Sequence, residues 1–154
     1  MNLRLLDGTA LTLWVGSLWS IGYVAVPVLF RAQPDKQLAG MLAGEMFSLL
    51  GWIALVCGAY LLLRNAARFG KLTLREPAFL NLALMLVLSL AIQFGIQPLM
   101  NGLKSQALPL EVMHSPYADT FAMWHGISSI LYLIESLLGL AAIYFHTRPT
   151  LPPS

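Results

Sequence analysis

Four long apolar stretches dominate the pattern of hydrophobic and polar positions along the chain. Each holds about 20 residues with few charges, which is the length that a helix needs to cross a hydrocarbon core of ~30 Å. The stretches predict membrane spans at about residues 9–30, 42–63, 78–100 and 120–145. We therefore expect an all-α fold, an integral membrane four-helix bundle that residues 1–146 form as one domain, followed by a disordered, proline-rich tail at 147–154.

The fourth stretch carries two ionisable side chains, His125 and Glu135, within its apolar sequence. At about 100° per residue, its polar side chains fall on one stripe of the helix, with Glu135 at the edge of that stripe. A charge at the bilayer centre costs roughly 3 kcal/mol, so the stripe is expected to face other helices or an internal cavity. Its members are His125, Ser128, Ser129, Tyr132, Ser136 and Gly139.

Small residues form seams on the first two stretches, and such seams let helix backbones approach closely in lipid. The residues that we assign to helix packing are Gly16, Ser20, Gly40, Gly44, Gly51 and Gly58.

Prolines and glycines mark the ends of the predicted helices. Pro27 removes a backbone donor and should bend or end the first helix. Pro34 and Asp35 suit the first turn of the second helix, and Gly70 is expected to end the basic extension of that helix. Residues 101–119 form the longest connection, which we expect to be an irregular cap.

Six polar side chains come to one level in the outer third of the membrane if the first and third helices ascend and the others descend. They are Tyr23, Glu45, Gln93, Gln97, His125 and Ser129. Glu135 lies about 15 Å deeper, nearer Thr12 and Asn81. We take these six residues and Glu135 as candidates for a polar seam or for an ion or ligand site. We also expect Glu45 and His125 to meet across the second and fourth helices.

Basic residues are distributed unevenly between the two ends of the predicted bundle. Six lie on the side of the termini and of the connection at 64–76, whereas three lie on the other side. Cytoplasmic segments that flank membrane spans are enriched in Lys and Arg. We therefore expect a multi-pass protein of the cell (inner) membrane with both termini in the cytoplasm.

Composition excludes several classes of function. The chain is 58% hydrophobic and 10% charged, against roughly 25% charged residues in soluble domains. Its net charge of +2 is not arranged as a basic stripe, so we exclude nucleic-acid binding. The one cysteine, Cys57, allows neither an intrachain disulfide nor a cysteine metal cluster. There is no metal-ligand spacing, nucleophile elbow or evident internal sequence repeat, so we expect no catalytic residues, no metal and no cofactor.

Four short motifs follow one another along nearly the whole chain. They are Trp14-x-Gly16, Pro27-x-Leu29-Phe30, Ala39-Gly40-x-x-x-Gly44-x-x-Phe47 and Phe121-x-x-Trp124-His125-x-x-Ser128. In order and spacing they resemble the transmembrane protein 205-like family. The resemblance implies a four-span membrane protein, with no assigned activity and no catalytic residues to carry over.

The Trp-x-Gly start is also similar to the copper-resistance D-type membrane proteins and the haem-pathway J-type oxidase. Those families use several membrane histidines for metal or haem. In this chain His114 and His146 lie in or near the ends of the spans, and His125 alone lies within one.

These observations favour a non-enzymatic membrane protein that transports or senses a small solute or ion, or supports a partner, through a polar seam between helices. The alternative is a haem- or copper-binding membrane redox protein that uses His125. The expected partners are the lipid bilayer and either further copies of the chain or another membrane protein. Four helices leave little room for a pore, so a wide one would require a homo-oligomer.

Overall fold

The computed structural model describes residues 3–148, apart from the side chains at positions 69, 71 and 72, and these residues form helices joined by short connections. The helices are α1 (Leu3–Trp19), α2 (Val26–Ala32), α3 (Lys36–Phe69), α4 (Pro77–Leu90), α5 (Gln97–Ala107) and α6 (Ala118–Thr147). Between them lie the shorter helical segments η1 (Ser20–Ala25), η2 (Gly70–Arg75), η3 (Ala91–Ile96) and η4 (Val112–His114). The predicted all-α, four-helix membrane fold is confirmed.

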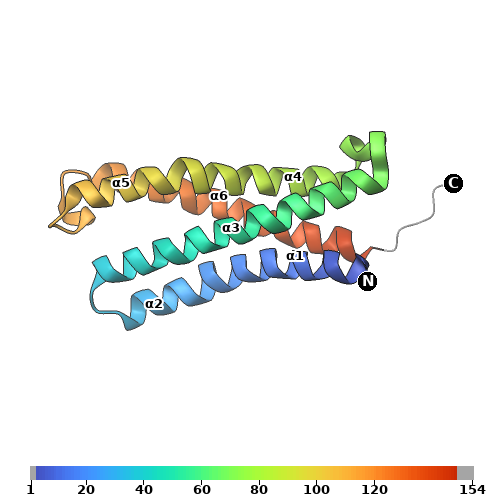
Figure 1. The fold of residues 1–154 in the computed structure, drawn as a ribbon. Helices are drawn as coiled ribbons and strands as arrows, with labels where there is room; N and C mark the ends of the chain where they lie inside the picture. Colours follow the sequence, from blue (N-terminus) through green and yellow to red (C-terminus); the bar gives the residue numbers. More distant parts are fainter. Residues whose placement is uncertain (1–2, 149–154) are drawn as a thin grey trace.

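Four rods run side by side along the long axis of the molecule (Figure 1). The described residues contain four helices that are long and apolar enough to cross a membrane: Leu3–Ala32, Lys36–Arg68, Pro77–Ala107 and Ala118–Thr147. The start of α1, the α3–α4 connection and the end of α6 lie at one end, called here the terminus end, and the other two connections lie at the loop end. Residues 149–154 of the predicted tail lie outside the described residues.

Local sequence explains where the second span begins and ends. The Asp35 side chain accepts a hydrogen bond from the backbone N–H of Leu38 at 3.0 Å and so caps the start of α3. Gly70 follows the last residue of α3 with φ 54°, a conformation that glycine adopts without steric cost. The end at Gly70 agrees with the sequence prediction, whereas Pro34 and Asp35 precede the first turn of α3 instead of lying in it.

The third span is longer than the sequence predicted. The expected irregular cap at 101–119 is wrong over its first seven residues, because α5 continues to Ala107. Lys104 stabilises this extension by donating a hydrogen bond to the carbonyl oxygen of Gly40 at 3.0 Å. The helix ends where Pro109 restricts the residue before it to extended backbone.

The first and third spans each contain a π-helical segment shortly before a proline. In the first span η1 precedes Pro27, and in the third span η3 precedes Pro98. A proline has no N–H, and its ring collides with the carbonyl group four residues earlier. A π-helical turn, whose hydrogen bonds reach five residues back, moves that carbonyl group away. Pro27 therefore alters the hydrogen-bonding pattern of the first span without ending it.

Residues 3–69 (the first half) and 77–147 (the second half) repeat one arrangement. In each half, a span with a π-helical segment is followed by a long uninterrupted helix. The π-helical segments η1 and η3, and likewise Pro27 and Pro98, are separated by 71 residues. The repeat is not evident in the sequence because the side chains at corresponding positions differ in chemistry.

Contacts between the long helices repeat as well. A Cβ atom at Gly58 would lie 3.0 Å from Trp14 and 2.9 Å from Leu86. A Cβ atom at Gly139, 81 residues later, would lie 3.0 Å from Val15 and 3.7 Å from Met85. Since Met85 and Leu86 follow Trp14 and Val15 by 71 residues, the two glycines make equivalent contacts with the halves exchanged.

The core lies between α1, α3, α4 and α6, with the fully buried side chains of Trp14 and Met85 at its centre. Only 17–33% of the most apolar part of each span is buried inside the bundle. Most of the remaining apolar surface therefore faces outward, as expected in lipid.

At the terminus end, Asp7 connects α1 to α3 through hydrogen bonds. Its carboxylate accepts one from Tyr60 at 2.9 Å and one from Arg64 at 3.2 Å.

Candidate functional site

The candidate site is the carboxyl group of Glu135, which lies inside the bundle at about half the length of α6. The side chain is 3% exposed. Ser89, from α4, donates a hydrogen bond to its Oε1 atom at 2.5 Å. An ionisable side chain in the middle of a membrane bundle is costly unless it is partnered, and such residues usually have a function.

The indole of Trp14 completes the immediate surroundings of this carboxyl group from α1. Trp14 is fully buried and its Nε1–H faces Glu135 without forming a hydrogen bond to it. Among the described residues, Trp14 Nε1 is the one buried side-chain nitrogen or oxygen atom without a hydrogen-bond partner. The carboxyl group therefore has one bonded donor and one further donor nearby, which leaves unused hydrogen-bonding capacity at the centre of the bundle.

Hydroxyl groups extend the polar region from Glu135 toward the loop end. Tyr23, in η1, donates a hydrogen bond to the Oγ atom of Ser136 at 2.9 Å. Tyr132 donates to the carbonyl oxygen of Leu18, and its ring meets the Tyr23 ring edge to face at a centroid distance of 6.1 Å. Tyr23 is itself 51% exposed, so the hydrogen-bonded pair of Ser136 and Tyr23 extends from the interior to the outer surface of the bundle.

Gln93, in η3, lies four residues after Ser89 toward the loop end. It is buried, and a Cβ atom at Gly51 would lie 2.1 Å from its Oε1 atom. In the equivalent contact of the other half, the glycine and the large side chain change places. Gly22, in η1, corresponds to Gln93, and a Cβ atom there would lie 2.4 Å from the ring of Tyr132, which corresponds to Gly51. In each case a glycine makes room for a large polar side chain beside a π-helical segment.

The first half has an apolar pair where the second half has Ser89 and Glu135. Ser89 corresponds to Leu18, 71 residues earlier in the chain, and Glu135 corresponds to Ala54, 81 residues earlier. All four side chains are buried. The architecture therefore does not require polar groups at this level, and the second half alone carries them.

Several predicted site residues lie elsewhere. Glu45 and His125 do not meet: both side chains are exposed, and the ion pairs of the described residues do not include them. The two helices touch at this end of the bundle through the Phe47 and Tyr132 rings, whose centroids are 5.5 Å apart, but Glu45 and His125 lie on its outer surface. The His125 ring stacks on Phe121 of its own helix at a centroid distance of 6.1 Å, and Ser129 donates to the carbonyl oxygen of His125.

Gln97 is only partly buried at the first residue of α5. Among the described residues, no group of three histidine, cysteine or acidic side chains could hold a metal ion. The surroundings of His125 therefore lend no support to the haem or copper alternative.

The predicted separation of Glu135 from an outer cluster is also wrong. Tyr23 bonds to Ser136, which directly follows Glu135, and the carboxyl group has Ser89 and Trp14 as polar neighbours rather than Thr12 and Asn81. Asn81 donates instead to the carbonyl oxygen of Leu138. Side chains on a helix lean toward its N-terminus, so Tyr23 reaches back along the ascending first span to Ser136.

Sequence reasoning missed Trp14 and Ser89 as site residues. Trp14 stands out in the sequence only as part of the Trp14-x-Gly16 motif, and Ser89 is not part of any motif. Their positions along the helices could have indicated that they lie at the level of Glu135. Trp14 and Ser89 are each about 12 residues from the terminus end of their helices, and Glu135 is 12 residues before Thr147. At 1.5 Å per residue, these three side chains share one level.

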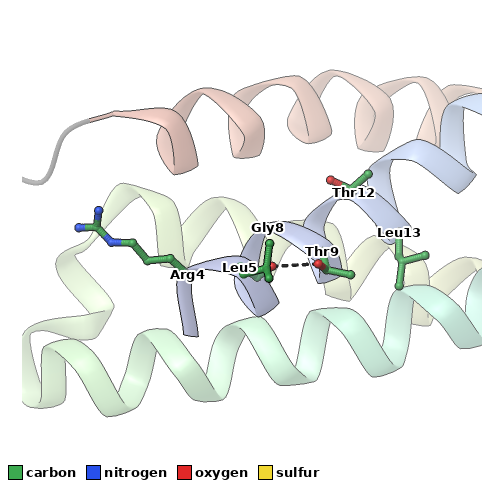
Figure 2. Close-up of a pocket in the computed structure, with 6 residues that line it drawn as sticks. All are labelled: Arg4, Leu5, Gly8, Thr9, Thr12 and Leu13. Carbon is green, nitrogen blue, oxygen red and sulfur yellow. Dashed lines mark hydrogen bonds between the residues drawn. The ribbon is translucent and has the colours of Figure 1, made fainter. Parts of the chain in front are cut away.

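The predicted packing glycines divide into two groups. Gly51 and Gly58 lie at close approaches between helices, whereas a Cβ atom at Gly16 would have nothing within 4 Å. Gly16 instead borders one of two hollows on the outward side of α1. One hollow is lined by Arg4, Leu5, Gly8, Thr9, Thr12 and Leu13, with Thr9 bonded to the carbonyl oxygen of Leu5 (Figure 2). The other lies between α1 and α6 and includes Gly16 and Trp19.

Residues 9–109 match the model of the family described as a domain of unknown function, DUF4149. The match includes Trp14, Tyr23, Ser89 and Gln93 but ends before α6, which carries Glu135. No curated protein and no solved structure matches the chain. Because the family model covers well over half of its length, the chain belongs to the DUF4149 family.

Proposed function

We propose that this member of a family of unknown function is a non-enzymatic membrane protein that moves or senses protons, alone or together with a small solute, and that Glu135 takes up and releases the proton. The observation that carries the proposal is the buried carboxyl group at a position where the first half of the same bundle has Ala54. A carboxyl group can bind and release one proton, whereas alanine cannot.

Stability alone is a weak reason to hold a carboxyl group at this position. Interhelical hydrogen bonds in membranes contribute only ~0.6 to 2 kcal/mol, and a buried charge costs more than that unless it is well paired. Glu135 has one hydrogen-bonded partner, Ser89, and faces the unbonded indole N–H of Trp14. This incomplete partnering supports a group that changes its protonation rather than one that only joins two helices.

The neighbouring hydroxyl groups support a route for the proton toward the loop end. Ser136 follows Glu135 directly and accepts a hydrogen bond from Tyr23, which belongs to the loop-end half of the first span. Hydroxyl groups donate and accept hydrogen bonds at the same time, so they can relay a proton between fixed partners.

Proton flux in liposomes tests the proposal. The full chain is reconstituted with a pH-sensitive dye inside the vesicles, and a potassium gradient with valinomycin sets the membrane potential. We expect faster acidification or alkalinisation than in protein-free vesicles, and we expect Glu135→Gln to reduce it to the protein-free rate. Glu135→Asp, which keeps a carboxyl group, should retain part of the flux.

Glu45→Gln is the matched control, because it makes the same chemical change at an exposed carboxyl group of the same chain. Its flux should equal that of the unaltered protein. If Glu135→Gln conducts as well as the unaltered protein, Glu135 has a structural role. In that case support of a partner protein becomes the better reading of the polar region.

We further propose that the protein lies in the inner membrane with both termini in the cytoplasm. The terminus end carries six basic residues, Arg4, Arg64, Arg68, Lys71, Arg75 and Arg148, against three at the loop end, Arg31, Lys36 and Lys104. Reporter fusions between residues 108 and 117 should behave as periplasmic. Cytoplasmic behaviour of those fusions would reverse the proposed orientation.

A closer relationship to the transmembrane protein 205-like family is part of this proposal. It rests on the four motifs from Trp14-x-Gly16 to the Trp124-His125 pair. The described structure supports the relationship through its four spans, which are what that resemblance implies.

A further inference from the structure

A groove runs along the outward side of the bundle between α1 and α6. Its volume is 340 Å³, and its floor on α1 is made by Gly8, Thr12 and Gly16. On α6 it is bordered by Ile143 and His146. The corresponding interface of the two halves, between α3 and α4, is packed more closely.

The groove has the length of one bilayer leaflet. Gly8 lies at its terminus end and Trp19 at its inner end, and the two residues are 11 positions apart on one helix. At 1.5 Å per residue this distance is ~16 Å, close to half of a hydrocarbon core of ~30 Å. A concave surface of this length facing lipid suits one acyl chain that enters from the terminus side.

Positive charge lies where the headgroup of such a lipid would sit. Arg4 lines the adjoining hollow of 370 Å³, which shares Gly8 and Thr12 with the groove. Figure 2 shows the Arg4 side chain pointing away from Thr12, toward the end of the bundle where α6 ends. His146 borders the groove at the same end, since a Cβ atom at Gly8 would lie 3.4 Å from its Nε2 atom.

The nearest acidic residue does not neutralise this charge. Asp7 binds Tyr60 and Arg64 on the side of α1 that faces α3. The residues that line the groove and the hollow include no acidic side chain. The rim therefore complements an anionic group rather than a zwitterionic one.

We propose that this groove binds one anionic phospholipid, with an acyl chain along Gly8, Thr12 and Gly16 and the phosphate at Arg4 and His146. A helix from a second copy of the chain is the competing occupant. In a symmetric dimer about the membrane normal, each partner would present the same face. The two Arg4 side chains would then meet at one depth, which disfavours a dimer through this groove.

Native mass spectrometry of the full chain tests the proposal. The protein is released from vesicles that contain equal amounts of phosphatidylglycerol and phosphatidylcholine, and the retained lipid is identified and counted. We expect one phosphatidylglycerol per chain. Arg4→Gln should lower the preference for phosphatidylglycerol by roughly five-fold, since one basic residue near an anionic lipid contributes a factor of that order.

Gly16→Leu fills the groove without a clash, because a Cβ atom at Gly16 would have nothing within 4 Å. This variant should lose the retained lipid of either kind. Gly126→Leu makes the same change at another open position, on α6 near the loop end, and Arg31→Gln removes a charge at the loop end. Both controls should retain phosphatidylglycerol as the unaltered protein does.

Three results would overturn the proposal: equal retention of the two lipids by the unaltered protein, unchanged preference in Arg4→Gln, or unchanged retention in Gly16→Leu. A dimer that Gly16→Leu converts to a monomer would also overturn it and would identify a second copy as the occupant. Thermal unfolding in detergent checks that each variant is folded. The result does not depend on proton flux, so this proposal can fail while the proposed function holds.

Discussion

The two halves of the bundle place different side chains on one framework. At the level of Glu135, the second half pairs a carboxyl group with Ser89, whereas the first half pairs Leu18 with Ala54. Both pairs are buried, and both lie between helices that meet at equivalent glycines, Gly58 and Gly139. The comparison shows that packing at this level needs only side chains that fill the volume. An ionisable group is not needed for packing, which points to a function.

The exchange of large and small residues at the π-helical segments supports the same conclusion. Gly22 makes room for Tyr132, and Gly51 makes room for Gln93, so each contact combines one glycine with one large side chain. The large residue comes from the uninterrupted helix α6 in one contact and from η3 in the other. Geometry is therefore preserved through complementary sizes rather than through identical residues.

The largest effect should come from filling the equivalent glycines. Gly58→Leu and Gly139→Leu each force atoms into the buried core around Trp14 and Val15, and we expect a loss of ~3 kcal/mol for each, because overpacking distorts the surroundings. Thermal unfolding in detergent measures the loss, with Gly126→Leu as the control at an open position. A severe loss in one variant and none in the other would break the correspondence of the halves.

A smaller effect is expected where a flexible side chain can yield. Gly51→Ala brings a methyl group to the place of the Gln93 amide, and we expect a cost of ~2 kcal/mol. Adding Gln93→Ala should recover most of this loss, with a coupling energy of ~1 kcal/mol or more in a double-mutant cycle. Additive losses would show that Gly51 and Gln93 do not share the space.

The ion pair at the terminus end belongs to the first half alone, since Asp7 corresponds to Ala78. Asp7→Asn should destabilise the protein by roughly 1 kcal/mol, a modest value because Asp7 and Arg64 are partly exposed. Glu45→Gln, at an exposed carboxyl group, should stay within about 0.5 kcal/mol of the unaltered protein. Equal losses in both variants would remove any special role of Asp7 in joining α1 to α3.

Only a small change in stability should come from the most informative substitution. Ser89→Leu combined with Glu135→Ala gives the second half the apolar pair of the first half. Replacing a buried polar pair by apolar residues of similar volume is often neutral or stabilising, so we expect unfolding within about 1 kcal/mol of the unaltered protein. Proton flux should nevertheless be lost. A variant that unfolds would show that the polar pair is required for the fold.

The order and type of the helices could be predicted because they depend on local sequence. Four apolar stretches of sufficient length cannot leave their backbone groups unbonded in lipid, so they form helices. Asp35 and Gly70 act within one turn of the backbone that they cap: α3 ends at Gly70 as predicted and begins directly after Asp35. The extension of α5 to Ala107 depends instead on Lys104 reaching Gly40 of another span, which no local pattern reveals.

The site was predicted only in part, because its members come from three helices. Glu135 stood out in the sequence as an acidic residue within an apolar stretch. Its partners depend on which helices are neighbours: α6 packs on α1 and α4, which bring Trp14 and Ser89 to it, and lies diagonally across from α3, which carries Glu45. The angular position of a residue on its own helix does not contain this information.

By itself, the sequence determined the fold class, the four spans and the presence of one acidic residue that lipid would not accept. Hydrophobic length and local capping decide these features, and both act over distances of a few residues. Only the tertiary structure decided that Glu135 meets Ser89 and Trp14, that the halves exchange large and small residues at Gly22 and Gly51, and that a basic-rimmed groove opens beside α1. Each of these features depends on which faces of distant helices pack together.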